Sequence, residues 1–264
     1  MKKFKLLTPL FILLFTVVLT SCSSDDDENP EPDRTLEDIE ADYQALNLSA
    51  GTNDVSIDNR GGNPWNFRII IPESEANSPR PLVLTLHGAS GGDQNAHKYT
   101  DCYAEEGFAE IDPIILSPNG GIDLWDDPFN QDMILGLLYL VNKFQNVDDS
   151  KVVVTGYSNG GNGAWKYAET TPGLFSAAIP IASSYNTYNT VGDPRLIDVP
   201  LYVIHGEEDE LFPVEQTEEW VEATRSAGTD VTLEVVPELT HYNPCEYTPP
   251  VKNAAKWLRE EVWN

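Results

Sequence analysis

The sequence predicts an α/β domain with a doubly wound, mostly parallel sheet that is preceded by an antiparallel hairpin. Two observations carry this prediction. Short, almost continuously apolar runs alternate with longer segments whose apolar residues recur at helical spacing, as strands and helices do around a parallel sheet. Ahead of these runs, two strand-like segments flank the turn-rich stretch 59–64, which favours a hairpin. No internal repeat interrupts this order.

The individual elements follow from the same patterns. The hairpin strands are expected at 54–58 and 65–71, after a short helix within 35–48. Buried strands are predicted at 81–88, 112–120, 150–156, 175–183, 199–206 and 231–237. Helices are predicted at 93–108, 130–146, 160–172, 214–228 and 251–263.

The N-terminal residues have the order of an export signal. Three lysines precede an apolar run over 6–19 that is short for a membrane span, and small residues follow. Residues 19–22, LTSC, resemble a bacterial lipobox, which implies lipid modification at Cys22. A plain signal peptide or an uncleaved anchor is the alternative.

Domain boundaries follow from this order. We expect a signal peptide over 1–21, an acidic tether with a short helix over 22–50, and a catalytic domain over 51–264. The acidic, proline-containing stretch 23–33 cannot bury apolar surface, so it is expected to be solvated. It also resembles the acidic tag of surface-exported lipoproteins, which implies an outer-membrane protein at the cell surface.

The charge of the chain excludes some partners. Its 43 acidic and 16 basic residues give a formal net charge of −27. Nucleic acids and anionic bilayers are bound through Lys/Arg clusters, so neither is expected as a partner through the folded domain. No His/Cys/Asp cluster has metal-ligand spacing apart from the acidic turn 207–210, and we expect no metal or cofactor. Cys102 and Cys245 could pair in an exported protein, or remain free.

A serine between glycines stands where one predicted strand ends and a helix begins. Residues 156–160, GYSNG, match GxSxG, in which small residues leave room for a sharp turn with the serine at its apex. The following helix start offers backbone N–H groups where an oxyanion would form. Ser158 is therefore the candidate nucleophile. An ordinary strand–helix turn with a capping serine is the alternative.

With this motif, the chain from about residue 50 to 264 resembles the serine hydrolases of the α/β-hydrolase fold. The stretches 81–92, 156–183 and 199–213 most resemble secreted feruloyl esterases, acetylxylan esterases and polyhydroxyalkanoate depolymerases. They also resemble a related set labelled predicted peptidases or phospholipases. The resemblance implies an acyl-enzyme mechanism.

A serine hydroxyl needs a base to take its proton, and the chain has four histidines. His241 follows the last predicted strand, where this fold places its base, although it could be a solvent-facing loop residue. His87 resembles the histidine of an oxyanion loop. His205 comes too early in the chain order serine, acid, histidine, but should lie near the site. His97 is expected on the surface of an outer helix.

The acid is assigned by the turn at 205–213, HGEEDELFP, which resembles the HGxxDxxxP turn of the family. The match places the carboxylate on Asp209. The neighbouring Glu207, Glu208 and Glu210 are competitors. The resulting order Ser158, Asp209, His241 is the order that this fold uses.

Two backbone N–H groups are candidates for the oxyanion hole. One belongs to Asn159, directly after the serine. The other belongs to Ala89 in the stretch 86–92, LHGASGG, which resembles the loop that supplies the second donor. Ser90 is the alternative to Ala89.

The segment 184–198 is too short to form a large lid, so the serine should lie in an open cleft that suits bulky or polymeric esters. Trp125 and Tyr185 are candidate substrate-binding aromatics, with Tyr188 as a further possibility. Plain packing of these loop aromatics is the alternative.

The favoured function is a lipid-anchored serine carboxylesterase acting on polysaccharide-linked feruloyl or acetyl esters. A peptidase or a polyhydroxyalkanoate depolymerase would use the same three residues. A surface-binding lipoprotein without catalysis is a further alternative, although all three catalytic positions are filled.

Overall fold

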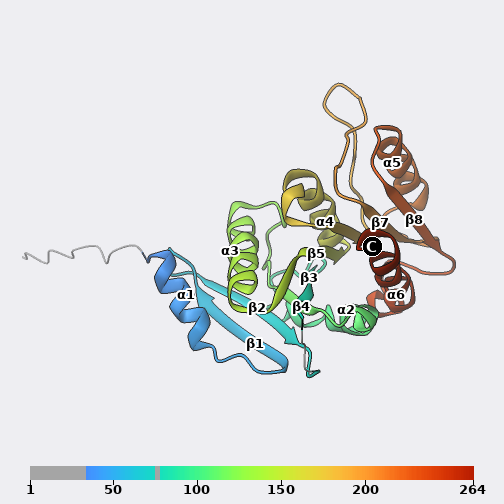
Figure 1. Ribbon diagram of the computed structural model, residues 1–264. Helices are drawn as coiled ribbons and strands as arrows, with labels where there is room; N and C mark the ends of the chain where they lie inside the picture. Colours follow the sequence, from blue (N-terminus) through green and yellow to red (C-terminus); the bar gives the residue numbers. More distant parts are fainter. Residues whose placement is uncertain (1–33, 75–77) are drawn as a thin grey trace, which may run out of the picture. The chain divides into compact units, whose positions relative to one another are not determined.

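An eight-stranded sheet runs through the described residues, 34–74 and 78–264 of the computed structural model (Figure 1). Its order is β1-β2-β4-β3-β5-β6-β7-β8. The strands are β1 (Gly51–Asp58), β2 (Pro64–Ile71), β3 (Arg80–Leu86), β4 (Ile114–Pro118), β5 (Val147–Tyr157), β6 (Ala177–Ile181), β7 (Leu201–Gly206) and β8 (Val231–Val236). The six strands from β4 to β8 in this order are parallel, and this confirms the doubly wound α/β fold.

The predicted hairpin forms the antiparallel edge of the sheet. Asp58 of β1 faces Pro64 of β2 across the turn, and β2 then pairs antiparallel with β4. Asn59 closes the connection, because its side-chain oxygen accepts from the N–H groups of Gly61 and Asn63. The turn residues seen in the sequence therefore set the register of the hairpin.

Helices cover both faces of the sheet. They are α1 (Leu36–Ala45), α2 (Asp101–Gly107), α3 (Pro128–Phe144), α4 (Asn159–Thr170), α5 (Val214–Ser226) and α6 (Thr248–Trp257). Buried residues of α1, α3, α4 and α5 share one apolar core, while those of α2 and α6 share the other. Figure 1 shows α2 and α6 beside each other, and their Cα traces are in contact. Side chains from both faces of the strands are therefore buried.

The short helix predicted within 35–48 is present as α1, and it belongs to the folded unit. Thr35 and Asp38 form a capping box at its start. Tyr43 is buried and stacks on Phe144 of α3, with ring centroids 5.7 Å apart. Helix α1 therefore belongs to the same compact unit as the residues from 51 onward.

Several expectations fall on residues that the structure does not describe. The signal peptide over 1–21, Cys22 and the acidic stretch 23–33 lie outside the described residues. Among the residues that are described, no helix has the length and apolar character needed to cross a membrane.

The segment after β6 forms an extended loop instead of a lid domain. Within 184–198 the backbone makes one isolated bridge, between Tyr188 and Pro194. This confirms the expectation of a fold without a large lid. The loop leaves β6 at the same end of the sheet as the turn after β5, since the two strands are parallel neighbours. Ligands of doubly wound sheets bind at this carboxyl end.

Candidate active site

Ser158 occupies a strained turn between β5 and α4. Its backbone has φ 57° and ψ −120°, a conformation that L-residues rarely adopt. Gly156 and Gly160 make the turn possible, because a Cβ at Gly156 would lie 2.3 Å from the carbonyl oxygen of Gly160. A Cβ at Gly160 would lie 1.9 Å from the carbonyl oxygen of Leu86. The glycines of GYSNG are required by close backbone approach.

Three side chains predicted from the sequence form one hydrogen-bonded chain. Nε2 of His241 lies 2.9 Å from Oγ of Ser158, and Nδ1 of His241 lies 2.8 Å from Oδ2 of Asp209. His241 is on the loop after β8, and Asp209 is on the turn after β7. His241 and Asp209 are buried, while Ser158 is half-buried. The serine is thus open to a substrate, and its two partners are shielded from water.

Of the four acidic residues in the turn, the structure identifies Asp209 as the partner of His241. Oδ1 of Asp209 accepts from the N–H groups of Leu211 and Phe212, at 2.9 and 2.8 Å. Glu207, Glu208 and Glu210 are all exposed, and Glu210 reaches only the backbone N–H of His241. Asp209 alone among the four carboxylates contacts the imidazole.

Asp209 remains ionised in this buried position. Burial would raise its pKa, but the hydrogen bond with His241 and the N–H of Phe212 outweigh burial, and the pKa falls below its ordinary value. An ionised carboxylate beside Nδ1 fixes that nitrogen as the N–H donor. Nε2 is then left with its lone pair toward Ser158, as a general base requires.

His205 lies near the site, as the sequence predicts, and helps to hold the turn that carries Asp209. Its Nε2 donates to the carbonyl oxygen of Phe212 and is 3.6 Å from Oδ2 of Asp209. Burial lowers the pKa of His205, so the ring is neutral beside the carboxylate at neutral pH. The ring therefore braces the turn that carries Asp209.

His87 anchors the loop after β3. Its Nε2 accepts from the N–H of Gly120, and Nδ1 lies 2.7 Å from the carbonyl oxygen of Gly88. Burial lowers the pKa of His87, which keeps the ring neutral and able to accept at Nε2. The structural role expected for His87 is thus visible in its contacts.

The structure corrects the expectation that Trp125 stacks on a substrate. Trp125 is 2% exposed, and its indole N–H donates to the carbonyl oxygen of His87. Its ring lies edge-on to the His87 ring, with centroids 4.9 Å apart. The small exposed part of Trp125 lines a hollow near the serine, and the rest of the residue is packed inside the protein. Trp125 supports the loop 87–90 through the hydrogen bond to His87.

Tyr185 is held by neighbouring side chains. Its ring stacks on Trp165, with centroids 5.8 Å apart, and its hydroxyl donates to Glu169. The guanidinium of Arg195 lies 5.6 Å from the ring centroid. Tyr185 is half-buried and lines a hollow near the serine, while Tyr188 lies farther along the same loop.

Three hollows surround the loop 87–90 and the start of α4. The serine hollow, about 340 Å³, contains Ser158 together with Ala89, Asn159, Ile122 and Phe212, among others. The tyrosine hollow, about 310 Å³, shares His87–Ser90 with it and is lined by Tyr99, Tyr103 and Tyr157. The polar hollow, about 230 Å³, shares Leu124, Asn159 and Asn162 with the serine hollow and adds Lys166, Ser184 and Asn186. A substrate at Ser158 can extend in two directions.

The two residues expected to supply the oxyanion donors lie beside the serine hollow. Ala89 and Asn159 line it beside Ser158. Asn159 is the first residue of α4, so its N–H has no partner one turn earlier in the helix. The side chain of Ser90 donates to the carbonyl oxygen of Gly121 and fixes the far end of the loop.

The sequence led to a wrong expectation for one residue of this region and gave no prediction of one hollow. The prediction that His97 lies on the surface is wrong, because His97 is 4% exposed and accepts from the side-chain amide of Asn119. The tyrosine hollow was not predicted. The one feature of the sequence that pointed to this hollow is a tyrosine, Tyr157, directly before Ser158.

The structure also joins Cys102 and Cys245 in a disulfide. Cys102 lies in α2, and Cys245 lies in the short turn Pro244–Tyr247 that follows His241. Within residues 34–74 and 78–264, no group of three or more His, Cys, Asp or Glu side chains is placed to hold a metal ion.

This arrangement has the parts needed to cleave an acyl bond. A hydroxyl, a base and a carboxylate are hydrogen-bonded in sequence, beside backbone N–H groups at a helix start. Residues 67–264 match the dienelactone hydrolase family over most of the chain. The chain belongs to the dienelactone hydrolase family. It is therefore a hydrolase.

This family member resembles two curated bacterial proteins. A Yersinia pestis protein with the provisional name carboxymethylenebutenolidase is 31% identical over 202 residues, which cover 68% of this chain and 74% of the relative. An Escherichia coli protein with the same provisional name is 22% identical over 215 residues, which cover 72% of this chain and 78% of that protein.

Among solved structures, a thermostable esterase superposes with a TM-score of 0.64 at 22% identity, over 79% of this chain and 62% of the esterase. The family member thus spans less than two thirds of that esterase. At this identity the similarity concerns the α/β-hydrolase fold, and the earlier prediction of that fold is confirmed.

Proposed function

We propose that the protein is a serine carboxylesterase that works through an acyl-enzyme. The hydrogen-bonded chain from Ser158 through His241 to Asp209 carries this proposal. Its geometry matches what hydrolysis by an activated serine requires, and a strained turn presents the serine to an open hollow.

In the first half-reaction, Oγ of Ser158 attacks the ester carbonyl while Nε2 of His241 takes the hydroxyl proton. Asp209 stabilises the imidazolium that forms. The carbonyl oxygen becomes an oxyanion, which accepts from the N–H groups of Ala89 and Asn159. Each such donor contributes about 10²–10³ in rate. His241 then gives its proton to the departing alkoxide, and the acyl group stays on Ser158.

In the second half-reaction, water takes the place of the alcohol. His241 removes a proton from the water, which attacks the acyl carbon, and the same N–H groups stabilise the second oxyanion. Collapse of this intermediate breaks the bond to Oγ, and the proton returns from His241 to Ser158. The carboxylic acid leaves and the enzyme is regenerated.

The hollows favour uncharged esters. Among the described residues that line the serine hollow and the tyrosine hollow there is no lysine or arginine, and Asp93 and Asp123 are acidic. An anionic group placed in either of these two hollows would have no compensating cation among the lining residues, and Lys166 lies only in the polar hollow. This argues against a substrate that, like a carboxymethylenebutenolide, bears a carboxyl group, even though the relatives carry that name.

We further propose that the ester is carried by a polysaccharide, as a feruloyl or acetyl group. The polar hollow supports this, because amide and hydroxyl side chains such as Asn162, Ser184 and Asn186 suit sugar hydroxyls. A truncated carbohydrate esterase from gut microbiota superposes with a TM-score of 0.65 at 13% identity, over 81% of this chain and 97% of that one. An exported lipoprotein anchored at Cys22, on the outer membrane and facing outward, would meet such a polymer.

The hydrolase chemistry is tested with simple esters. The full-length protein is expected to hydrolyse 4-nitrophenyl acetate, and Ser158→Ala is expected to lower kcat by a factor of about 10⁵ or more. Circular dichroism of the variant should match the wild-type protein. Turnover that survives Ser158→Ala would contradict the assignment of the nucleophile.

The substrate class is tested separately. Release of ferulate from feruloylated arabinoxylan or of acetate from acetylated xylan is expected to exceed the hydrolysis of a dienelactone or of a peptide. Faster cleavage of the dienelactone would overturn the preference for uncharged esters. Labelling with radioactive palmitate, lost in Cys22→Ala, tests the lipid anchor.

A further inference from the structure

The tyrosine hollow lies directly beside the reacting serine. Gly88 separates the two, since a Cβ built on Gly88 would lie 3.3 Å from Cβ of Ser158. Three tyrosines line the hollow together with small and apolar residues such as Ala96 and Pro244, and its volume of about 310 Å³ is enough for a ring-bearing substituent. A substrate held by Ser158 can therefore place one bulky group there.

The hollow also contains a buried phenol that no described residue satisfies. Tyr157 is 9% exposed, and its hydroxyl makes no hydrogen bond with the described residues. Tyr103, the neighbouring phenol, is paired with the hydroxyl of Thr85. Tyr157 therefore lines the hollow while its hydroxyl is closed off from solvent.

Two segments far apart in the sequence contribute walls to this hollow. One wall is the stretch 96–103, which contributes Ala96, Tyr99, Thr100 and Tyr103. The other is Pro244, on the turn that follows His241. Neither wall belongs to the sheet, and the two are held together by the packing of α2 against α6 and by the disulfide.

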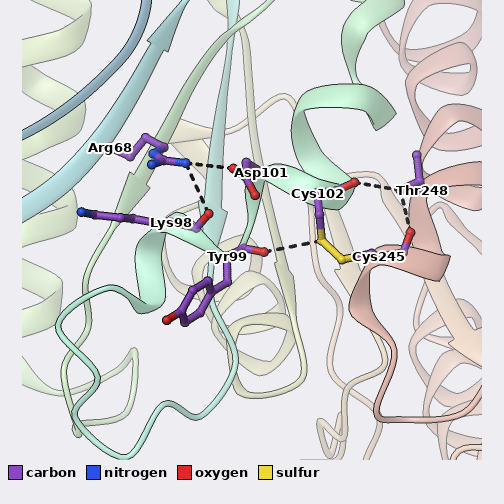
Figure 2. Close-up of a disulfide and its surroundings, with 7 residues drawn as sticks. All are labelled: Arg68, Lys98, Tyr99, Asp101, Cys102, Cys245 and Thr248. Carbon is purple, nitrogen blue, oxygen red and sulfur yellow. Dashed lines mark hydrogen bonds and ion pairs between the residues drawn. A yellow bond between two sulfur atoms is a disulfide. The ribbon is translucent and has the colours of Figure 1, made fainter.

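The disulfide joins these two walls. Cys102 lies between Tyr99 and Tyr103 in the chain, and Cys245 directly follows Pro244, with the two Cα atoms 5.2 Å apart (Figure 2). The Cys102 sulfur also lies 3.6 Å from the carbonyl oxygen of Tyr99. Neither cysteine lines the hollow, so the covalent bond acts on the two walls through the adjoining residues of the chain.

Further contacts brace the two ends of the bond. The Thr248 hydroxyl lies 3.0 Å from the carbonyl oxygen of Cys102 and 2.7 Å from that of Cys245, as Figure 2 shows. Arg68 of β2 pairs with Asp101, the residue before Cys102. One wall is thus tied to the sheet, and the disulfide transfers that restraint to the other wall.

From these observations we infer that the Cys102–Cys245 cross-link is a specificity-determining element of the site. It fixes the spacing between the walls of the tyrosine hollow and thereby sets how tightly an uncharged ester with a ring-bearing group binds. This inference rests on the proposed esterase function. His241 is held by Asp209 and Ser158 independently of the disulfide, so esters too small to reach the hollow react at an unchanged rate.

The test compares three esters in the full-length protein. Methyl acetate has no ring, methyl 3-phenylpropanoate has a ring in the acid half, and benzyl acetate has a ring in the alcohol half. In the double variant Cys102→Ala/Cys245→Ala, KM is expected to rise about tenfold for the ester whose ring occupies the hollow. For methyl acetate, kcat and KM are expected to change less than twofold. The ring-bearing ester that responds identifies the half that the hollow holds.

A second variant keeps the proposal testable if the double variant does not fold. Thr248→Val retains the disulfide but removes the hydroxyl between the two wall carbonyls, and it is expected to raise the same KM by a smaller factor. Thr170→Val, which removes an exposed hydroxyl bonded to the carbonyl oxygen of Lys166, is the matched control and should change neither KM. Dithiothreitol should reproduce the effect in the wild-type protein and leave the double variant unchanged.

The outcomes separate the two proposals. A KM that rises equally for all three esters, or that does not change for any of them, would overturn the inference while leaving the esterase function intact. If the wild-type protein hydrolyses none of the three esters, the proposed function fails, and the inference fails with it.

Discussion

Trp125 donates its indole N–H to the backbone carbonyl of His87, across 2.9 Å. This hydrogen bond connects the loop after β4 to the loop that carries Ala89, which faces the serine hollow. His87 in turn accepts from the N–H of Gly120. The loop 87–90 is therefore held by the segment 120–125 through both the side chain and the main chain of His87.

Trp125→Phe is expected to lower kcat for small esters by about threefold to tenfold, because loss of the donor leaves the His87 carbonyl unpaired and loosens the loop. KM should change less, since the indole does not contact substrate. Steady-state kinetics on 4-nitrophenyl acetate measures both constants. If KM rises strongly while kcat is constant, Trp125 contacts the substrate after all.

Asp209→Asn is expected to lower kcat by a factor of about 10³–10⁴, because an amide can no longer fix the tautomer of His241 or stabilise the imidazolium. The matched control is Glu208→Gln, which changes an exposed carboxylate in the same turn and should leave kcat within twofold. Equal losses in the two variants would show that the charge of the turn matters more than its contact with His241.

Gly160→Ala is expected to lower the free energy of unfolding by about 2–4 kcal/mol, because the new Cβ would overlap the carbonyl oxygen of Leu86 and the backbone would have to shift. Gly173→Ala is the control. A Cβ at Gly173 has no atom within 4 Å, so its effect should stay within about 0.5 kcal/mol. Urea unfolding measures both, and similar values for the two variants would refute the steric argument.

The buried His97 predicts a loss of stability in mild acid. Burial lowers the pKa of His97 to about 4, against an ordinary value of about 6.5 in the unfolded chain. Between these values the unfolded state binds a proton that the folded state does not, so stability falls as the pH drops through this window. For His97 the loss between pH 7 and pH 5 is about 2 kcal/mol.

His87 and His205, whose pKa values burial also lowers, act in the same direction. Urea unfolding at pH 7 and pH 5 measures the combined effect. In His97→Gln the loss between the two pH values is expected to be smaller by about 2 kcal/mol. A pH dependence unchanged from the wild-type protein would show that His97 is not the buried, neutral group described here.

Patterns local in the chain allowed much of the fold to be predicted. Alternation of apolar runs and helical segments determines the parallel sheet, and the turn residues at 59–64 determine the hairpin. Ser158 and His241 could be proposed because each follows a predicted strand, whereas Asp209 and the order of the three residues came from the resemblance to the α/β-hydrolase family. For the sheet and the hairpin the physical cause is local: backbone conformation, side-chain period and turn chemistry.

What depended on tertiary structure was the environment of each side chain. Whether Trp125 faces a ligand or the His87 carbonyl, and whether His97 lies on the surface or in the interior, depends on which segments pack against them. Burial and pairing between Cys102 and Cys245, 143 residues apart, arise only when α2 meets the turn before α6. The sequence by itself therefore determined the α/β fold class and the three candidate residues Ser158, Asp209 and His241. The packing of distant segments determined which residues surround these three. Contacts between distant segments could not be predicted, because they produce no periodic pattern in the sequence.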